Sequence, residues 1–189
     1  IVYKGIGDVL LTTPVLRALK KAMPDSRLYF LTRRPSLKIL KNNPRLDGVF
    51  CREDSPLRAI RAAGIDIAID FMRSASSGFY ALFSGAGKRL AFSYKGGRLF
   101  YNVMPEKRPG AGYTAFDRLQ LIEPLGVSHD GPELELSFAP ENAARADAFL
   151  AGAGVRPGEF LVTMDITSPR EHRRWAPENF TRLADNLAA

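Results

Sequence analysis

The chain is poor in the residues that build disulfides and metal sites. It has one cysteine, Cys51, and two histidines, His129 and His172, among 189 residues. A single cysteine excludes an internal disulfide and is typical of proteins from a reducing compartment. No histidines, cysteines or carboxylates have the spacing of metal ligands, and Cys51 forms no nucleophile pattern with either histidine. We therefore expect no metal site and a packed or half-exposed thiol.

Long apolar runs are also missing. No stretch approaches the ~20 consecutive apolar residues that span a bilayer. The start lacks the basic segment, apolar segment and cleavage site of a signal peptide. Hydrophobic residues make up 46% of the chain and charged residues 25%, proportions that are ordinary for a globular protein with a sizeable core. We expect a cytoplasmic protein.

Acidic residues are outnumbered by basic ones, and the net charge of +7 indicates an anionic partner such as phosphates, nucleic acid or an acidic membrane surface. Basic residues are denser at 88–89, 95–98, 107–108 and 170–174. The chain has no zinc-finger spacing, no basic region with heptads and no clustered aromatic platform, so we expect no nucleic-acid partner.

Strands and helices are predicted to alternate. After an opening strand, we predict strands at 28–32, 48–51, 65–71, 88–93, 133–138 and 160–166, and helices at 36–42, 56–64 (capped by Ser55), 76–83, 114–125, 140–151 and 177–188. Repeated βα units with short connections predict a Rossmann-like parallel sheet with helices on both faces. A new unit begins near Pro157, so we expect a domain at 1–156 and, at 157–189, the first strand and helix of a truncated second domain.

The opening stretch IVYKGIGDVLLTTPVLRALKKAMPDS predicts a strand, a glycine turn and a long amphipathic helix. Ligands of open α/β sheets bind where strands end, and Asp8 lies there, after Gly5 and Gly7, which permit close approach. Its carboxylate could accept a proton from an attacking hydroxyl. The alternative is a helix cap. No glycine stands three residues after Gly7, so the dinucleotide fingerprint is absent.

Two further polar stretches follow predicted strands. In ITSPREHRRWAPENF, residues 166–180, arginines and one histidine precede a helix, which suits a diphosphate; the alternative is a solvated loop with Trp175 as a packing anchor. Asp70 ends a strand, and the residues after it could bind an acidic or sugar acceptor: Arg73, Ser74, Ser76 and Ser77. The alternative is helix capping by the serines. The aromatic residues that follow are expected in the core: Phe79, Tyr80 and Phe83.

Three segments resemble a known family. GIGDVLLTTPVLRALKKAMPDSRLYFLT resembles the opening of glycosyltransferase family 9, the lipopolysaccharide heptosyltransferases. IDIAIDF followed by SGAGKRLAF and FYNV is similar to the middle of that family, and RRWAPENFTRLADNL resembles its Lys/Arg-x-Trp-Pro segment. The three segments occur in the family's order and cover most of the chain.

The resemblance implies a GT-B fold, with two Rossmann-like domains facing across a cleft. It implies inverting transfer of heptose from ADP-heptose to the lipopolysaccharide inner core, with no metal or other cofactor. Asp8 would be the general base, and Arg173 would contact the donor phosphates, with Arg174, Thr167 and Ser168 beside it. The first domain would hold the lipopolysaccharide-core or lipid A-linked acceptor, near Gly5, Gly7, Thr12, Thr13, Asp70, Arg73 and Ser76.

The chain departs from the family pattern at several positions. Lys4 and Gly5 stand where many members have a serine, Ala176 replaces a proline, and Ser76 replaces an arginine. The later nucleotide-contacting segment is missing, so we expect this stretch alone to be inactive. The competing hypothesis is a non-catalytic or truncated module that binds an anionic glycolipid, for which Asp8 would be dispensable. Basic surface is also expected to bring the protein to the cytoplasmic face of the inner membrane.

Overall fold

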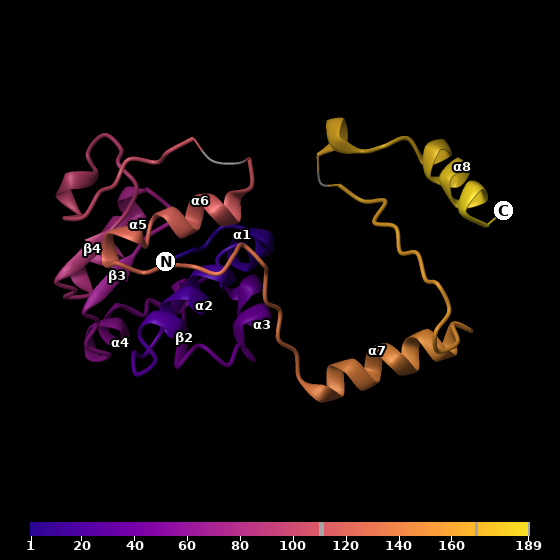
Figure 1. Cartoon of the computed structure of the whole chain (residues 1–189), viewed down its shortest axis with the longest axis horizontal. Coiled ribbons are helices and arrows are strands. Elements are labelled where there is room, and N and C mark those ends of the chain that lie inside the picture. Colours follow the sequence, from indigo (N-terminus) through magenta and orange to yellow (C-terminus); the bar gives the residue numbers. More distant parts are fainter. Residues whose placement is uncertain (110–111, 169, 189) are drawn as a thin grey trace. The chain divides into compact units, whose positions relative to one another are not determined.

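The structure is a computed structural model that describes residues 1–109, 112–168 and 170–188. The chain divides into two compact units, Ile1–Asn142 and Ala143–Ala189 (Figure 1). The predicted domain boundary after residue 156 stays a prediction.

Short parallel strands form the centre of the first unit. Strand β1 (Tyr29–Thr32) pairs with β2 (Gly48–Cys51), and β3 (Ile67–Ile69) pairs with β4 (Lys88–Leu90). The opening residues 1–3 join the two pairs, because Val2 N donates to Leu31 O at 3.0 Å and Phe71 N donates to Ile1 O at 3.2 Å.

The order across the unit is β2, β1, residues 1–3, β3, β4 and then Val103, which bridges Leu90 in parallel. In chain order this is 3-2-1-4-5-6, the arrangement of a doubly wound α/β fold. The predicted parallel, Rossmann-like sheet is confirmed. The order reverses between residues 1–3 and β3, and such a switch point is where these folds bind ligands at the carboxyl ends of their strands.

Eight α-helices are assigned within the described residues. They are α1 (Ile6–Leu10), α2 (Thr13–Ala22), α3 (Leu37–Leu40), α4 (Leu57–Ala62), α5 (Ala75–Phe83), α6 (Thr114–Gln120), α7 (Pro140–Gly152) and α8 (Pro177–Ala188). Single 3-10 turns follow several elements: η1 (Arg34–Ser36), η2 (Arg52–Asp54), η3 (Gly97–Leu99), η4 (Glu123–Leu125) and η5 (Glu171–Arg173).

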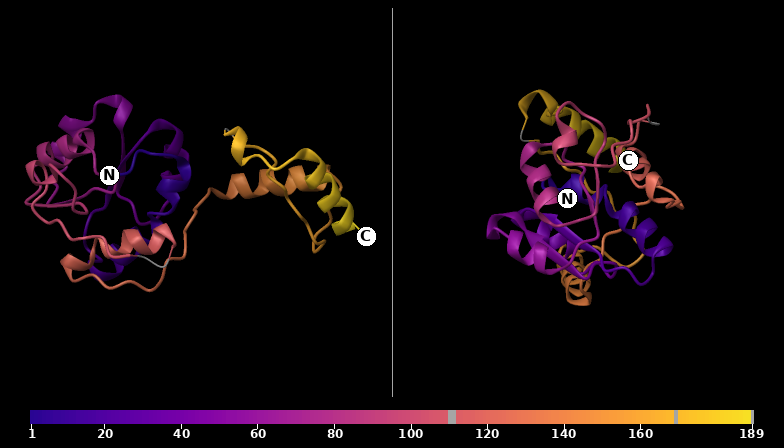
Figure 2. Two further views of the ribbon diagram at one scale, coloured as in Figure 1. Left: turned by 90° about the horizontal axis from the view of Figure 1, so that it is seen from above. Right: turned by 90° about the vertical axis from the view of Figure 1, so that its left-hand side faces the viewer.

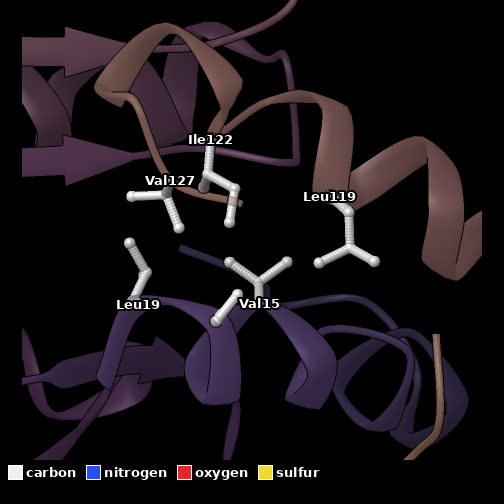
Figure 3. Close-up of a cluster of buried hydrophobic side chains, with 6 residues drawn as sticks. Val15, Leu19, Leu119, Ile122 and Val127 are labelled. Atoms are coloured by element: carbon white, nitrogen blue, oxygen red, sulfur yellow. The ribbon is translucent and has the colours of Figure 1, made fainter. Parts of the chain in front are cut away.

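Helices pack on both faces of the strands (Figure 2), because successive strand residues point to opposite sides. On one face, Val15 and Leu19 of α2 meet Leu119 of α6, with Ile122 and Val127 beyond it (Figure 3). On the other face, Ala81 of α5 packs in a cluster with Ala68, Ala91 and Tyr101. Hydrophobic core therefore lies on both faces of the strands whose carboxyl ends form the candidate site.

The predicted long opening helix is broken in two. Pro14 has no N–H to donate to the carbonyl oxygen of Leu10, so the helix cannot continue there. The Thr13 hydroxyl donates to that oxygen instead, at 2.8 Å. One residue earlier, Thr12 N donates to Val9 O at 3.0 Å, which tightens the last turn of α1.

Several predicted elements differ from the structure. Residues 133–138 and 160–166 have no strand assignment, because an alternating pattern forms a strand only where a neighbouring strand supplies hydrogen bonds. Ser55 does not cap α4: its φ of 48° is left-handed, and Pro56 is the N-cap. The predicted helix 114–125 ends at Gln120. The 3-10 turn η4 follows it and ends at Gly126, which is the C-cap.

Candidate functional site

Asp8 lies in the first turn of α1, at the carboxyl end of the opening segment. Gly5 is the N-cap of that helix, and no side chain caps it, so Asp8 is not the N-cap. Its place in the first turn still suits the helix dipole, as the structural alternative expected. The Asp8 side chain is 35% exposed. Gly5 and Gly7 beside it are exposed, and a Cβ at Gly7 would meet nothing within 4 Å. A ligand can therefore reach both the carboxylate and the backbone.

A buried arginine holds Asp8 in place. Arg118 Nη2 donates to Asp8 Oδ1 at 3.0 Å and Nη1 donates to the Asp8 carbonyl oxygen at 2.6 Å. Nη1 also donates to the Thr12 hydroxyl oxygen, and the guanidinium carbon lies 5.5 Å from the centre of the Phe71 ring. Burial lowers the pKa of the Arg118 guanidinium, and the Asp8 carboxylate opposes that shift.

The sequence analysis missed Arg118, although one signal for it existed. Arg118 lies between Ala115 and Leu119 on the buried face of α6. A charged residue on an apolar helix face needs a charged or hydrogen-bonding partner inside the protein. An arginine on the apolar face of α6 indicates that it has a partner inside the protein, but only the fold shows that the partner is Asp8.

The ion pair leaves Asp8 one oxygen for chemistry. Oδ1 is bound by Arg118, whereas Oδ2 accepts no hydrogen bond from the described residues. A fixed carboxylate with one solvent-facing oxygen can take a proton from a hydroxyl group brought within hydrogen-bond distance.

Asp70 supports the next strand end from inside the protein. Its side chain is fully buried; Oδ1 accepts a hydrogen bond from Met72 N at 2.7 Å, and Oδ2 accepts one from the Tyr101 hydroxyl. Burial, followed by the charge of Asp70, raises the pKa of Tyr101. The tight turn after β3 continues into Arg73, which adopts a left-handed φ of 55°. Contact of Asp70 with an acceptor stays a prediction.

The two threonines of the predicted acceptor site are buried at the helix break. The Thr12 hydroxyl donates to Asp8 O at 3.0 Å, and the Thr13 hydroxyl donates to Leu10 O. Both side chains shape the backbone under Asp8. Their predicted contact with the acceptor stays a prediction.

The start of α5 lies at the same edge. Ser74 and Ser77 form a capping box, each side chain bonded to the other's backbone N–H, so the capping interpretation holds for these two serines. Ser76 is exposed, and its Oγ lies 2.8 Å from the Tyr3 hydroxyl and 3.4 Å from Arg52 Nη2. Arg52 also stacks over the Tyr3 ring at 4.9 Å.

Arginines follow three of the parallel strands at this edge: Arg33 and Arg34 after β1, Arg52 after β2 and Arg73 after β3. The sequence analysis singled out only Arg73, because the others are scattered and no motif contains them. Parallel strands end on one side of a sheet, so the fold gathers these arginines near Asp8. Arg33 is paired there with Glu53 at 3.0 Å and Arg34 with Asp54 at 2.5 Å. Arg52 and Arg73 have no carboxylate partner among the described residues, and their charge suits an acceptor that is itself negative.

The predicted donor-phosphate residues lie in the second unit. Arg174 Nε donates to Ser168 O at 2.9 Å, and the Thr167 hydroxyl donates to Asp165 Oδ1 at 2.8 Å. Arg173 ends η5 and is exposed. Trp175 packs edge-on against Phe180, with ring centres 4.9 Å apart. Binding of donor phosphates by these residues stays a prediction.

Cys51 is a packed thiol, as predicted. It is buried, and its Sγ donates to Glu53 Oε2 at 3.2 Å. Burial, with that hydrogen bond, raises the pKa of the thiol. Among the described residues, no group of three or more histidines, cysteines and carboxylates could hold a metal ion. No helix in the described ranges is long and apolar enough to cross a membrane.

Two curated proteins resemble the chain, whereas no family model matches it. Lipopolysaccharide heptosyltransferase 3 of Escherichia coli is 23% identical over 202 residues, which cover 97% of this chain and 58% of that protein. The protein of the same name from E. coli strain K12 is 21% identical, with 96% and 57% covered. The chain therefore spans less than three fifths of the length of these relatives.

Solved structures extend the comparison to the fold. The glycosyl transferase family 9 structure from Veillonella parvula DSM 2008 matches with a TM-score of 0.86 and 26% identity, over 98% of this chain and 58% of that one. E. coli heptosyltransferase WaaC with ADP matches with a TM-score of 0.67 and 21% identity, over 98% and 61%. These neighbours are GT-B glycosyltransferases, so the predicted fold type is confirmed. The chain has the fold of the glycosyltransferase family 9 heptosyltransferases, over the part of that fold that it spans.

Proposed function

We propose that this chain is the acceptor-side part of a glycosyltransferase that moves a heptose from ADP-heptose to a lipopolysaccharide inner-core acceptor. The names of the curated relatives support the sugar and the acceptor class. The observation that carries the proposal is Asp8: a partly exposed carboxylate, fixed by Arg118, at the sheet edge where the strand order reverses.

The proposed reaction inverts the configuration at the anomeric carbon of the heptose. A hydroxyl oxygen of the acceptor attacks that carbon on the face opposite ADP, and the bond between the carbon and the diphosphate oxygen breaks. Asp8 Oδ2 takes the hydroxyl proton as general base. Arg173, with Arg174 and the start of α8, offsets the negative charge that grows on the departing diphosphate. In this proposal ADP-heptose is the donor substrate, and no resident cofactor or metal takes part.

The acceptor is a lipopolysaccharide core or a lipid A-linked sugar, which carries negative charge of its own. Arg52 after β2 and Arg73 after β3, which form no ion pair with the described residues, favour such a ligand. We place the reaction in the cytoplasm, at the inner face of the inner membrane. The second candidate function is a non-catalytic module that binds an anionic glycolipid through the same arginines.

A matched pair of substitutions tests the role of Asp8. Asp8→Asn keeps the shape of the side chain and an oxygen for Arg118, but it removes the base. Asp130→Asn is the control, because Asp130 is also paired with an arginine, at 2.9 Å, and is similarly exposed. In the full-length protein, with ADP-heptose and heptose-deficient lipopolysaccharide, ADP release should fall about 10²–10⁴-fold for Asp8→Asn and stay unchanged for the control.

Other outcomes would point elsewhere. Asp8→Asn turnover within a few-fold of wild type would remove Asp8 from the reaction and leave it a structural partner of Arg118. Absence of turnover in the wild-type protein, together with binding of the glycolipid, would favour the binding module.

A further inference from the structure

Apolar side chains are exposed together on α5 and η3. Phe79 is 52% exposed, Phe83 44% and Leu99 75%. The Phe79 and Phe83 rings stack with centres 5.9 Å apart, and Phe79 meets Phe100 edge-on at 5.4 Å. These three residues, together with Leu99, which precedes Phe100 in the chain, are here called the aromatic patch. The predicted core position of Phe79 and Phe83 is wrong, because α5 turns Ala81 to the core instead.

The surroundings of the aromatic patch are basic. Residues 71–105 contain five basic residues and no acidic one: Arg73, Lys88, Arg89, Lys95 and Arg98. Lys95 and Arg98 are exposed; Lys95 precedes η3 by two residues, and Arg98 lies within η3, next to Leu99 in the chain. An exposed apolar patch usually marks an interaction surface, and a basic rim calls for an anionic partner. A second copy of this chain would bring like charges together.

We propose that the aromatic patch docks on an anionic lipid surface, with its apolar side chains at the boundary between headgroups and acyl chains. Lys95 and Arg98 contact the anionic headgroups, an arrangement typical of interfacial membrane binding. Single-stranded nucleic acid fits less well, because bases stack on free aromatic faces. Phe79 and Phe83 each turn one ring face to the other, and Leu99 has no aromatic face.

The docking surface specifies how the protein contacts the membrane in the proposed function. The identity of that membrane rests on the proposed function. Phe79 follows the N-cap Ser74 by five residues, a rise of about 7.5 Å along the helix. Phe79 is therefore separated from the start of α5, at the sheet edge, by little more than one helical turn. A lipid-anchored acceptor would reach Asp8 from the surface on which the protein sits.

Vesicle flotation of the full-length protein tests the docking surface. We expect binding to phosphatidylcholine vesicles that contain phosphatidylglycerol, and little binding to phosphatidylcholine alone. Lys95→Glu with Arg98→Glu should reduce the partition about tenfold or more. The control, Lys38→Glu with Lys41→Glu, makes the same charge change around α3, which packs through Leu40 on the other face of the strands.

The apolar contribution has its own matched pair. Leu99→Ser should reduce vesicle partition about tenfold, whereas Leu136→Ser, at another exposed leucine of the first unit, should leave it unchanged. Wild-type partition in both patch variants would overturn the proposal, as would binding that is indifferent to phosphatidylglycerol. Loss of oligonucleotide binding in the patch variants, with vesicle binding intact, would assign the surface to nucleic acid instead.

Transfer to a water-soluble, deacylated acceptor separates this inference from the proposed function. The patch variants should retain that transfer, because none of their residues lies at the site. If the wild-type protein transfers no heptose but floats with anionic vesicles through the aromatic patch, the proposed function fails and the docking surface stands.

Discussion

Arg118 binds Asp8 across 110 positions of the chain, through the main chain as well as the carboxylate. The Arg118 guanidinium has two structural roles. It neutralises the partly exposed Asp8 carboxylate, and it donates hydrogen bonds to the Asp8 carbonyl oxygen and the Thr12 hydroxyl oxygen at the helix break. Its loss therefore affects folding and chemistry together.

Replacement of Arg118 should be costly even before activity is measured. Arg118→Ala leaves Asp8 O and the buried Thr12 hydroxyl with fewer partners, so the free energy of unfolding should fall by about 2 kcal/mol or more. Arg118→Lys keeps the charge but not the guanidinium's several donors. Its free energy of unfolding should therefore lie between those of the wild-type protein and Arg118→Ala. Urea denaturation measures both, and an Ala variant as stable as wild type would show that the contacts contribute nothing.

The backbone conformation of Arg73 lowers the stability of the folded protein. Its φ of 55° suits glycine better than a residue with a Cβ, so Arg73→Gly should raise the free energy of unfolding by about 0.5 kcal/mol. Ser55→Gly, at φ 48°, should have a similar effect. If Arg73 contacts the acceptor, only Arg73→Gly should raise the acceptor KM. Equal KM values for the two variants would remove Arg73 from the acceptor site.

At the scale of elements, side chains replace a strand ladder between residues 130 and 135. Arg17 donates to Asp130 Oδ1 at 2.9 Å, to Gly131 O at 2.9 Å and to Glu133 O at 2.7 Å. Arg45 donates to Glu135 Oε2 at 2.7 Å. Two arginines thus hold residues 130–135 against the rest of the first unit; the predicted strand at 133–138 overlaps this segment.

This attachment should be sensitive to acid. The hydrogen bond from Arg17 lowers the pKa of Asp130 to about 2, and the one from Arg45 lowers the pKa of Glu135. A lowered carboxyl pKa stabilises the folded state above the unfolded pKa of about 4, and the effect is lost as pH falls toward 2. Hydrogen exchange at 130–135, corrected for intrinsic rates, should therefore be faster at pH 3 than at pH 6.

Arg17→Ala provides the control for that measurement. It should speed exchange of the same segment at pH 6, whereas the amides of α5, which is capped by Ser74 and Ser77 without ionisable groups, should not change. An attachment indifferent to both pH and Arg17 would contradict the role of the ion pairs.

The sequence predicts the elements better than their ends. Periodicity identifies α5 and α8 almost to the residue, and it predicts β1 and β2 within one residue at each end. It does not detect the break before α2, although Pro14 is visible, because an apolar stripe continues through it. Likewise Asp8 could be predicted from its place after the first strand, whereas Arg118 could not, because tertiary packing selects its partner.

At the scale of the whole molecule, the two units differ in how they are stabilised. The first unit has five clusters of buried hydrophobic residues. In the second, none of the described residues of 143–188 is buried, and neither α7 nor α8 contributes a buried residue. Hydrophobic burial, the dominant stabilising term, belongs to the first unit.

Residues 1–142 should consequently melt close to the temperature of the 189-residue chain, within about 5 °C. Differential scanning calorimetry of the two forms makes the comparison, with hydrogen exchange showing slow amides in 1–142 and fast amides in 143–188. A drop of well over 10 °C on removal of 143–189 would mean that the second unit stabilises the first.

The break between α1 and α2 has a consequence for how position 8 can change. In an unbroken helix, the carbonyl oxygens of Asp8 and Leu10 would each receive an N–H from four residues on. Here Arg118 and Thr12 bind the first, and Thr13 binds the second. The turn is held through its main-chain carbonyl oxygens as well as through the Asp8 carboxylate, which pairs with the buried Arg118. A side chain at position 8 that keeps an oxygen for Arg118, such as asparagine, can therefore replace the carboxylate while the chain beneath it stays in place.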